Sequence, residues 1–160
     1  MRRTFGTGLA VALLALALGC GKKVGTAPGG PPDPSSGSGS IQGTWLLVAL
    51  EADGEVQDKV VKSMSAEEKT LNITPDQVIF FKGGQKEPLA YKLDPSKNPN
   101  EIDMSGTKRD GKPETMYGIY KFEGDKLTIC AVKSDEPADR PKELKTHAAG
   151  RALVMVFEKK

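Results

Sequence analysis

Short apolar segments separated by turn residues fill the chain from residue 41 to residue 160, and this alternation limits the possible folds more than any other feature. The clearest unit is a predicted hairpin of strands 117–122 and 126–132. A glycine stands at the first of its two loop positions, where a type II′ turn favours glycine. Counting outward from this loop pairs Tyr120 with Ile129 on the inward face.

Eight segments have this strand character: 44–51, 71–73, 78–81, 89–93, 101–105, 117–122, 126–132 and 152–158. The stretch 58–69 is the only plausible helix, with three apolar residues at helical spacing, namely Val60, Val61 and Met64. An irregular crossing would fit the same stretch. Because a meander of eight strands leaves exposed edges unless it closes, we expect an all-β fold, a small eight-stranded antiparallel barrel. A β-sandwich is the alternative.

The same period of two predicts which residues form the core. A two-residue loop at Pro75 and Asp76 pairs Ile73 with Val78 on a core face, since proline presets φ at the second turn position. In the first strand, the alternation places three residues inward: Trp45, Leu47 and Ala49.

The first 19 residues have the features of an export signal. Arg2 and Arg3 precede an apolar run at 9–18, and ten residues are too short to cross a bilayer, which needs about 20. The run ends at Gly19 and Cys20, as in a bacterial lipobox, so we expect Cys20 to be lipidated. The alternative is cleavage after Ala17, which would release a soluble exported protein.

Residues 20–40 are predicted to form the lipidated cysteine and a disordered linker, because glycine, proline and serine dominate this stretch. The remaining residues, 41–160, have the size of one domain. Removal of Arg2 and Arg3 lowers the basic residues from 23 to 21, which equals the 21 acidic residues. A neutral mature chain gives no electrostatic reason to bind nucleic acid.

Cys130 is predicted to lie on the outward face of its hairpin, opposite Ile119. Since Cys20 is either lipidated or removed, the mature chain offers Cys130 no second thiol, and no disulfide is expected. We therefore expect a free, partly covered structural cysteine.

Two loops carry the polar residues that an enzyme or a metal site would need. The first contains four oxygen donors, Asp94, Asn98, Asn100 and Asp103, but Pro99 stands where a familiar Ca²⁺ loop needs glycine. The second is 135–140, in which a local ion pair between Asp139 and Arg140 is expected. His147 is the single histidine, and no nucleophile–base motif is present. The sequence therefore predicts no catalytic residue, no metal site and no cofactor.

One further motif match fails on its context. Residues 106–112 fit the spacing of a phosphate-binding loop, but Pro113 replaces the hydroxyl residue that would hold Mg²⁺. The stretch lies between two predicted strands. We expect a hairpin loop.

Gly43-Thr44-Trp45 resembles the Gly-x-Trp signature of lipocalin-like barrels, in which the tryptophan packs across the closed end. The whole of 41–160 is similar to a lipocalin-like domain of unknown function that is abundant in planctomycete bacteria. The similarity rests on an ordered set of motifs: IQGTW at 41–45, LDPSKNP at 93–99, ID at 102–103, GIY at 118–120, GDKLTIC at 124–130 and RP at 140–141. The family often continues RP with a small polar residue and phenylalanine, whereas this chain has Lys142, Glu143 and Leu144. The resemblance implies a small barrel on an exported or lipid-anchored protein, without catalytic residues.

These observations predict a non-catalytic interaction or structural module of the cell envelope. It would be exported and anchored to the cell membrane or outer membrane through Cys20, with an envelope protein as its partner. The alternatives are a carrier of a small apolar ligand and an enzyme that uses the loop carboxylates. A carried ligand would contact inward aromatic residues, for which the candidates are Trp45, Phe80, Tyr91 and Tyr120.

Overall fold

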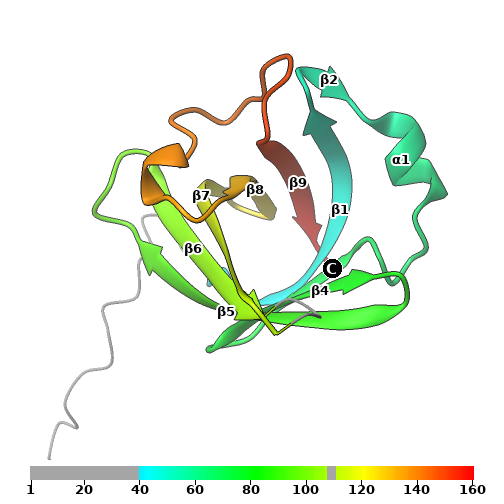
Figure 1. Cartoon of the computed structure of the whole chain (residues 1–160). Coiled ribbons are helices and arrows are strands. Elements are labelled where there is room, and N and C mark those ends of the chain that lie inside the picture. Colours follow the sequence, from blue (N-terminus) through cyan, green and yellow to red (C-terminus); the bar gives the residue numbers. More distant parts are fainter. Residues whose placement is uncertain (1–39, 108–110) are drawn as a thin grey trace, which may run out of the picture. The chain divides into compact units, whose positions relative to one another are not determined.

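Eight antiparallel strands close into a barrel in the computed structural model, which describes residues 40–107 and 111–160 (Figure 1). The wall consists of β1 (Gly43–Ala52), β3 (Thr70–Ile73), β4 (Gln77–Lys82), β5 (Gln85–Asp94), β6 (Asn100–Thr107), β7 (Pro113–Glu123), β8 (Lys126–Lys133) and β9 (Leu153–Lys159). Each strand pairs with its neighbour in this order, and β9 pairs back with β1. The predicted eight-stranded barrel is confirmed, and the β-sandwich alternative is excluded. Cys20, the predicted signal 1–19 and nearly all of the predicted linker lie outside the described residues.

Two small elements join β1 to β3. Strand β2 (Glu55–Val56), which is too short to show an alternating pattern, extends the β1 edge and was not predicted. Helix α1 (Asp58–Ser63) ends well before residue 69, because Ser65 and Glu68 form a separate turn by exchanging side-chain to backbone hydrogen bonds of 3.0 and 3.2 Å. No helix within the described ranges is long and apolar enough to span a membrane.

The predicted register of the hairpins is confirmed. In the β7–β8 hairpin, Tyr120 pairs with Ile129, and Gly124 has a φ of +59° at the first loop position. In the β3–β4 hairpin, Ile73 pairs with Val78. These pairs face the interior, as the period of two requires.

Strand β1 differs from the prediction at its centre. The pairing with β9 moves from Leu47 to Ala49 across one unpaired residue, Val48, which forms a β-bulge and is 39% exposed. Because a bulge shifts the alternation by one residue, Leu50 packs against the core in place of Ala49. The expectation that Ala49 faces inward is therefore wrong, and Glu51 becomes available to the outside of the wall.

The inward residues of all eight strands form one core. Its fully buried members include Trp45, Leu71, Val78, Ile102, Met104, Leu127 and Ile129, each 0% exposed. Gly118 allows β7 to approach its neighbours, since a Cβ there would lie 2.9 Å from the Cys130 carbonyl oxygen and 3.0 Å from the Ala131 Cβ. The core therefore depends on close packing across the barrel.

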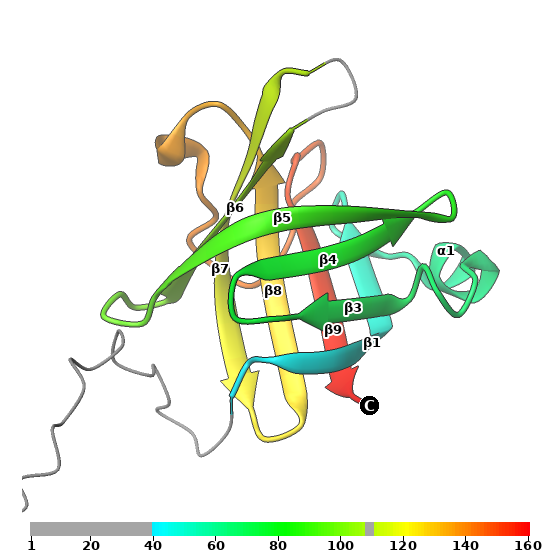
Figure 2. The same ribbon diagram turned by 90° about the horizontal axis from the view of Figure 1, so that it is seen from below.

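A long connection between β8 and β9, residues 134–152, lies against the outside of the wall and is called the strap here (orange in Figure 2). It contains the short 3₁₀ helix η1 (Pro137–Asp139). Beneath the strap, Ile119, Cys130 and Val154 form a small outer cluster, against which Leu144 of the strap packs. Cys130 faces outward as predicted, but it is 0% exposed and not partly covered, because the strap covers it.

Candidate functional site

The four aromatic residues predicted as ligand contacts all lie in or against the core. Trp45 and Tyr120 are buried members of the core, and Phe80 and Tyr91 are partly buried residues packed against it. The structure therefore gathers these four side chains on the inner face of one barrel. Apolar side chains of the core surround much of each ring.

Trp45 is held by protein contacts on its edge and on its face. Its Nε1 donates a 2.8 Å hydrogen bond to the carbonyl oxygen of Ile41. The ring of Phe122 meets the indole edge-on with centroids 5.7 Å apart, and Lys159 Nζ lies 5.5 Å from the indole centroid. These contacts place Trp45 at the end of the barrel where β1 begins and β9 ends.

The two tyrosine hydroxyls differ in their partners. Tyr91 donates a 3.0 Å hydrogen bond to the Thr74 carbonyl oxygen, whereas the buried Tyr120 hydroxyl has no hydrogen-bond partner among the described residues. Burial raises the pKa of both phenols. A buried hydroxyl without a hydrogen-bond partner costs about 1–3 kcal/mol of stability. A polar atom placed next to the Tyr120 hydroxyl would therefore be favoured, because it could form the missing hydrogen bond.

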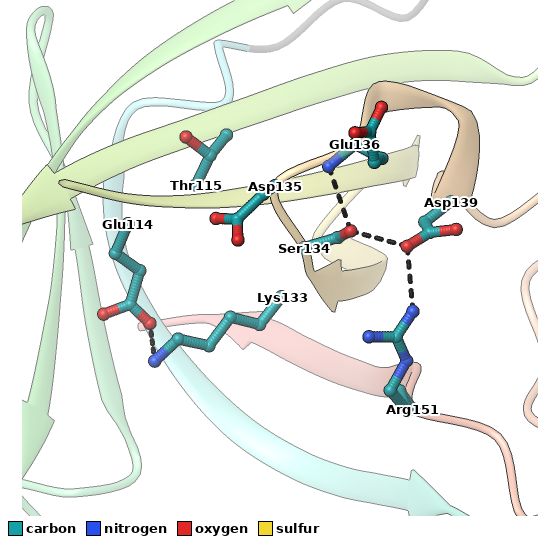
Figure 3. Close-up of a pocket in the computed structure, with 8 residues that line it drawn as sticks. All are labelled: Glu114, Thr115, Lys133, Ser134, Asp135, Glu136, Asp139 and Arg151. Carbon is teal, nitrogen blue, oxygen red and sulfur yellow. Dashed lines mark hydrogen bonds and ion pairs between the residues drawn. The ribbon is translucent and has the colours of Figure 1, made fainter.

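A polar pocket of about 520 Å³, the rim pocket, lies outside the wall where β7 begins and β8 ends (Figure 3). It is lined by charged and hydroxyl residues: Glu114, Thr115, Lys133, Ser134, Asp135, Glu136, Asp139 and Arg151. Glu114 and Lys133 form an ion pair across its floor. Asp139 Oδ2 accepts hydrogen bonds from Ser134 Oγ at 2.5 Å and from Arg151 Nη2 at 2.8 Å.

The rim pocket does not provide a nucleophile and a base. The Ser134 hydroxyl donates to the Asp139 carboxylate, and this hydrogen bond, supported by Arg151, lowers the pKa of Asp139. A carboxylate with a lowered pKa is a weak general base at neutral pH. The single imidazole, that of His147, pairs instead with Glu143 at 2.7 Å, away from these residues. Two ion pairs, Glu114 with Lys133 and Asp139 with Arg151, account for both cations of the pocket, and the carboxylates of Asp135 and Glu136 leave it acidic.

Arg140 is the most heavily engaged charged residue of the strap, and sequence reasoning assigned it the wrong partner. It does not pair with Asp139. Its guanidinium donates to the carbonyl oxygens of Gly118 at 2.8 Å and Ile102 at 3.3 Å. It also forms ion pairs with Asp103 at 2.7 Å and Glu101 at 3.4 Å, and only 15% of its side chain is exposed. A planar guanidinium can make such contacts together, so Arg140 fixes the strap to β6 and β7.

A second polar contact fixes the other half of the strap. The backbone N and the Oγ1 of Thr146 both donate to Glu51 Oε1 at 2.7 Å, and Gly54 N donates to Thr146 Oγ1 at 2.8 Å. The hydroxyl hydrogen bond is the main reason that the pKa of Glu51 lies below its ordinary value. The bulge in β1 makes this contact possible by turning Glu51 outward.

The two carboxylates among the four oxygen donors of the loop at 94–103 have separate protein partners. Asp94 accepts hydrogen bonds from the backbone N and Oγ of Ser96, as in a local turn, and Asp103 pairs with Arg140. Among residues 40–107 and 111–160, no group of three or more histidine, cysteine or acidic side chains is placed to hold a metal ion. The predicted hairpin loop at 106–112 begins too early, because Gly106 and Thr107 still belong to β6 and pair with β7. Residues 108–110 lie outside the described part of the chain.

Comparison with known proteins gave no match to a protein-family model, to a curated protein or to a solved structure.

Proposed function

We propose that the chain is a non-catalytic interaction or structural module of the cell envelope, which works through its outer surface. The observation that carries this proposal is the filling of the barrel interior. Residues from opposite sides of the wall, such as Trp45, Met104 and Ile129, are each 0% exposed. An eight-stranded barrel is just wide enough either to be filled by side chains or to hold one small ligand, and these residues favour the first case.

The outer surface offers more distinctive features than the interior. The strap is fixed by Arg140 and by Thr146, and pockets of about 400 to 520 Å³ open along it. Both cations of the rim pocket, Lys133 and Arg151, are held in ion pairs, and its acidic residues outnumber them by two, which favours recognition of a cationic group over catalysis. Lipidation of Cys20 would keep this outer surface at the membrane.

An apolar-ligand titration tests the proposal. The full-length chain with Cys20→Ser is titrated with palmitate while the fluorescence of Trp45, the single tryptophan, is recorded. We expect no saturable change. As a positive control, Met104→Ala opens a cavity in the core, and engineered apolar cavities bind small apolar molecules such as benzene. Benzene should therefore bind to Met104→Ala and not to the parent. Saturable one-site binding of palmitate by the parent would contradict the proposal.

The second candidate function is carriage of a small ligand inside the barrel. The observation that favours it is the buried Tyr120 hydroxyl without a partner. A ligand with one polar atom could satisfy this group. Tyr120→Phe separates the two candidates, because it should leave an interaction module unaffected and should weaken a ligand carrier.

A further inference from the structure

The rim pocket keeps a negative charge after its own ion pairs are counted. Four acidic and two basic residues line this cavity of about 520 Å³. Both basic residues are already held by acidic neighbours within the pocket, Lys133 by Glu114 and Arg151 by Asp139. Two acidic residues are left over, so a bound group would meet a net charge of −2.

The two remaining carboxylates belong to Asp135 and Glu136, which follow β8 at the start of the strap. Both residues are exposed, and no ion pair joins either side chain to a cation within residues 40–107 and 111–160. Figure 3 shows the Asp135 carboxylate between the two ion pairs of the pocket. Asp135 therefore faces the space in which a bound cation would lie, and the charge of the pocket favours a cationic partner.

The spacing of the acidic groups favours an organic cation over a metal ion. A calcium ion needs six to eight oxygen ligands within about 2.6 Å. In the part of the chain that the structure describes, no three acidic, histidine or cysteine side chains lie close enough to share one metal ion. An ammonium or guanidinium group carries several N–H donors, which can reach acceptors on different walls, including the hydroxyl of Thr115.

The exposure of the free carboxylates indicates how large the partner is. An exposed ion pair contributes only about fivefold or less to an affinity, because water screens both charges. A small amine would form one or two such pairs and would bind weakly. A protein segment with several basic residues forms more pairs at once and also contacts the strap. Arginine suits the site best, since its planar guanidinium can bind a carboxylate through two parallel hydrogen bonds.

We infer that the rim pocket binds an arginine-containing basic segment of a partner protein. The inference deepens the proposed function, on which it rests, by naming the surface and the chemistry of the partner. Guanidinium groups of the segment pair with Asp135 and Glu136, and Thr115 accepts a further hydrogen bond. Palmitate titration and peptide binding are separate measurements. Saturable palmitate binding would reject the proposed function, whereas failure of the peptide alone would reject only this inference.

Fluorescence polarisation with two labelled peptides tests the inference. The first is a nine-residue peptide of alternating arginine and serine, and the second has citrulline in place of each arginine, which keeps the shape and removes the charge. The full-length chain with Cys20→Ser should bind the arginine peptide at least tenfold more tightly than the citrulline peptide, a difference of about 1.4 kcal/mol. Added salt should weaken the binding.

Removal of the two free carboxylates locates the site. The double variant Asp135→Asn/Glu136→Gln should bind the arginine peptide at least tenfold more weakly, with an unchanged melting temperature because both residues are exposed. The matched control is Asp58→Asn/Glu67→Gln, which makes the same two amide replacements at exposed residues of α1 and the turn that follows it. These residues lie on the opposite side of the barrel from η1 (Figure 1), so the control should change the affinity less than twofold.

Three outcomes would overturn the inference. Equal affinity for the two peptides, including no binding of either, would remove the requirement for a cationic partner. Equal losses in the two double variants would show long-range attraction without a defined pocket. Displacement of the peptide by 1 mM spermidine or 1 mM Ca²⁺ at constant ionic strength would identify a site for free cations.

Discussion

Replacement of Arg140 by alanine should loosen the strap and destabilise the barrel. The side chain is 15% exposed and makes its closest contacts with the Gly118 carbonyl oxygen, at 2.8 Å, and with Asp103, at 2.7 Å. A hydrogen bond from a charged group contributes about 1.5–3 kcal/mol, and breaking a fully buried ion pair costs about 3–5 kcal/mol. The acidic partners here are 31% and 37% exposed, so solvent reduces the second figure. We expect a loss of about 2–4 kcal/mol in the free energy of unfolding.

The matched control is Arg151→Ala, on the same strap. Arg151 is 68% exposed and pairs only with Asp139 among the partners described, so its loss should cost no more than about 1 kcal/mol. Arg140→Lys is intermediate, since one ammonium group keeps the charge but cannot contact two carbonyl oxygens and a carboxylate together.

Two assays measure this difference. Urea denaturation followed by circular dichroism gives the free energy of unfolding, and limited trypsin digestion reports cleavage within the strap at Lys142 and Lys145. Arg140→Ala should be cleaved there faster than Arg151→Ala under conditions in which the barrel stays folded. If the two alanine variants have the same stability and the same cleavage rate, Arg140 does not fix the strap.

Further predictions concern the core, the anchor and two titratable groups. Trp45→Ala removes a fully buried indole and should cost about 3–5 kcal/mol; a melting temperature within two degrees of the parent would show that the residue is peripheral. Cys20→Ser should move the protein from the membrane to the soluble fraction, and continued membrane association would contradict lipidation at that residue. Burial raises the pKa of Cys130 from 9.0 to about 11, so alkylation at pH 8 should be at least about 100-fold slower in the folded protein than after denaturation; comparable rates would mean that the strap leaves the thiol open. The lowered folded-state pKa of Glu51 means that its stabilising contribution is present above the unfolded value near 4.5 and is lost as the pH falls through the folded value. The stability difference between the parent and Thr146→Val should therefore shrink between pH 6 and pH 3, and a difference independent of pH would contradict this role of Glu51.

The period of two was sufficient to predict most of the wall. The hairpin between β7 and β8 was predicted correctly residue by residue, because a glycine turn fixes the register and the register fixes every inward side chain. The same reasoning failed after Leu47, since a β-bulge depends on the strand that lies opposite and leaves no local mark in the sequence. Glu51 could not be recognised as an anchor of the strap for the same reason.

The strap was the part that sequence reasoning missed. The sequence of residues 135–140 predicted a local ion pair between Asp139 and Arg140. A sequence shows which opposite charges are neighbours along the chain, but it does not show partners that lie on distant strands. In the structure, the partners of Arg140 lie on β6 and β7, far away along the chain. Pro137 lies within this segment and Pro141 follows it directly, and two such closely spaced prolines were a signal that the backbone has a fixed path.

The filled interior is the central claim, and xenon binding tests it most directly. Xenon enters dry apolar cavities, so crystals of the chain under xenon pressure report empty space inside the barrel. We predict no xenon site among Trp45, Met104, Tyr120 and Ile129 in the parent, and one site in Met104→Ala. An ordered xenon atom inside the parent barrel would contradict the account and would favour a ligand carrier.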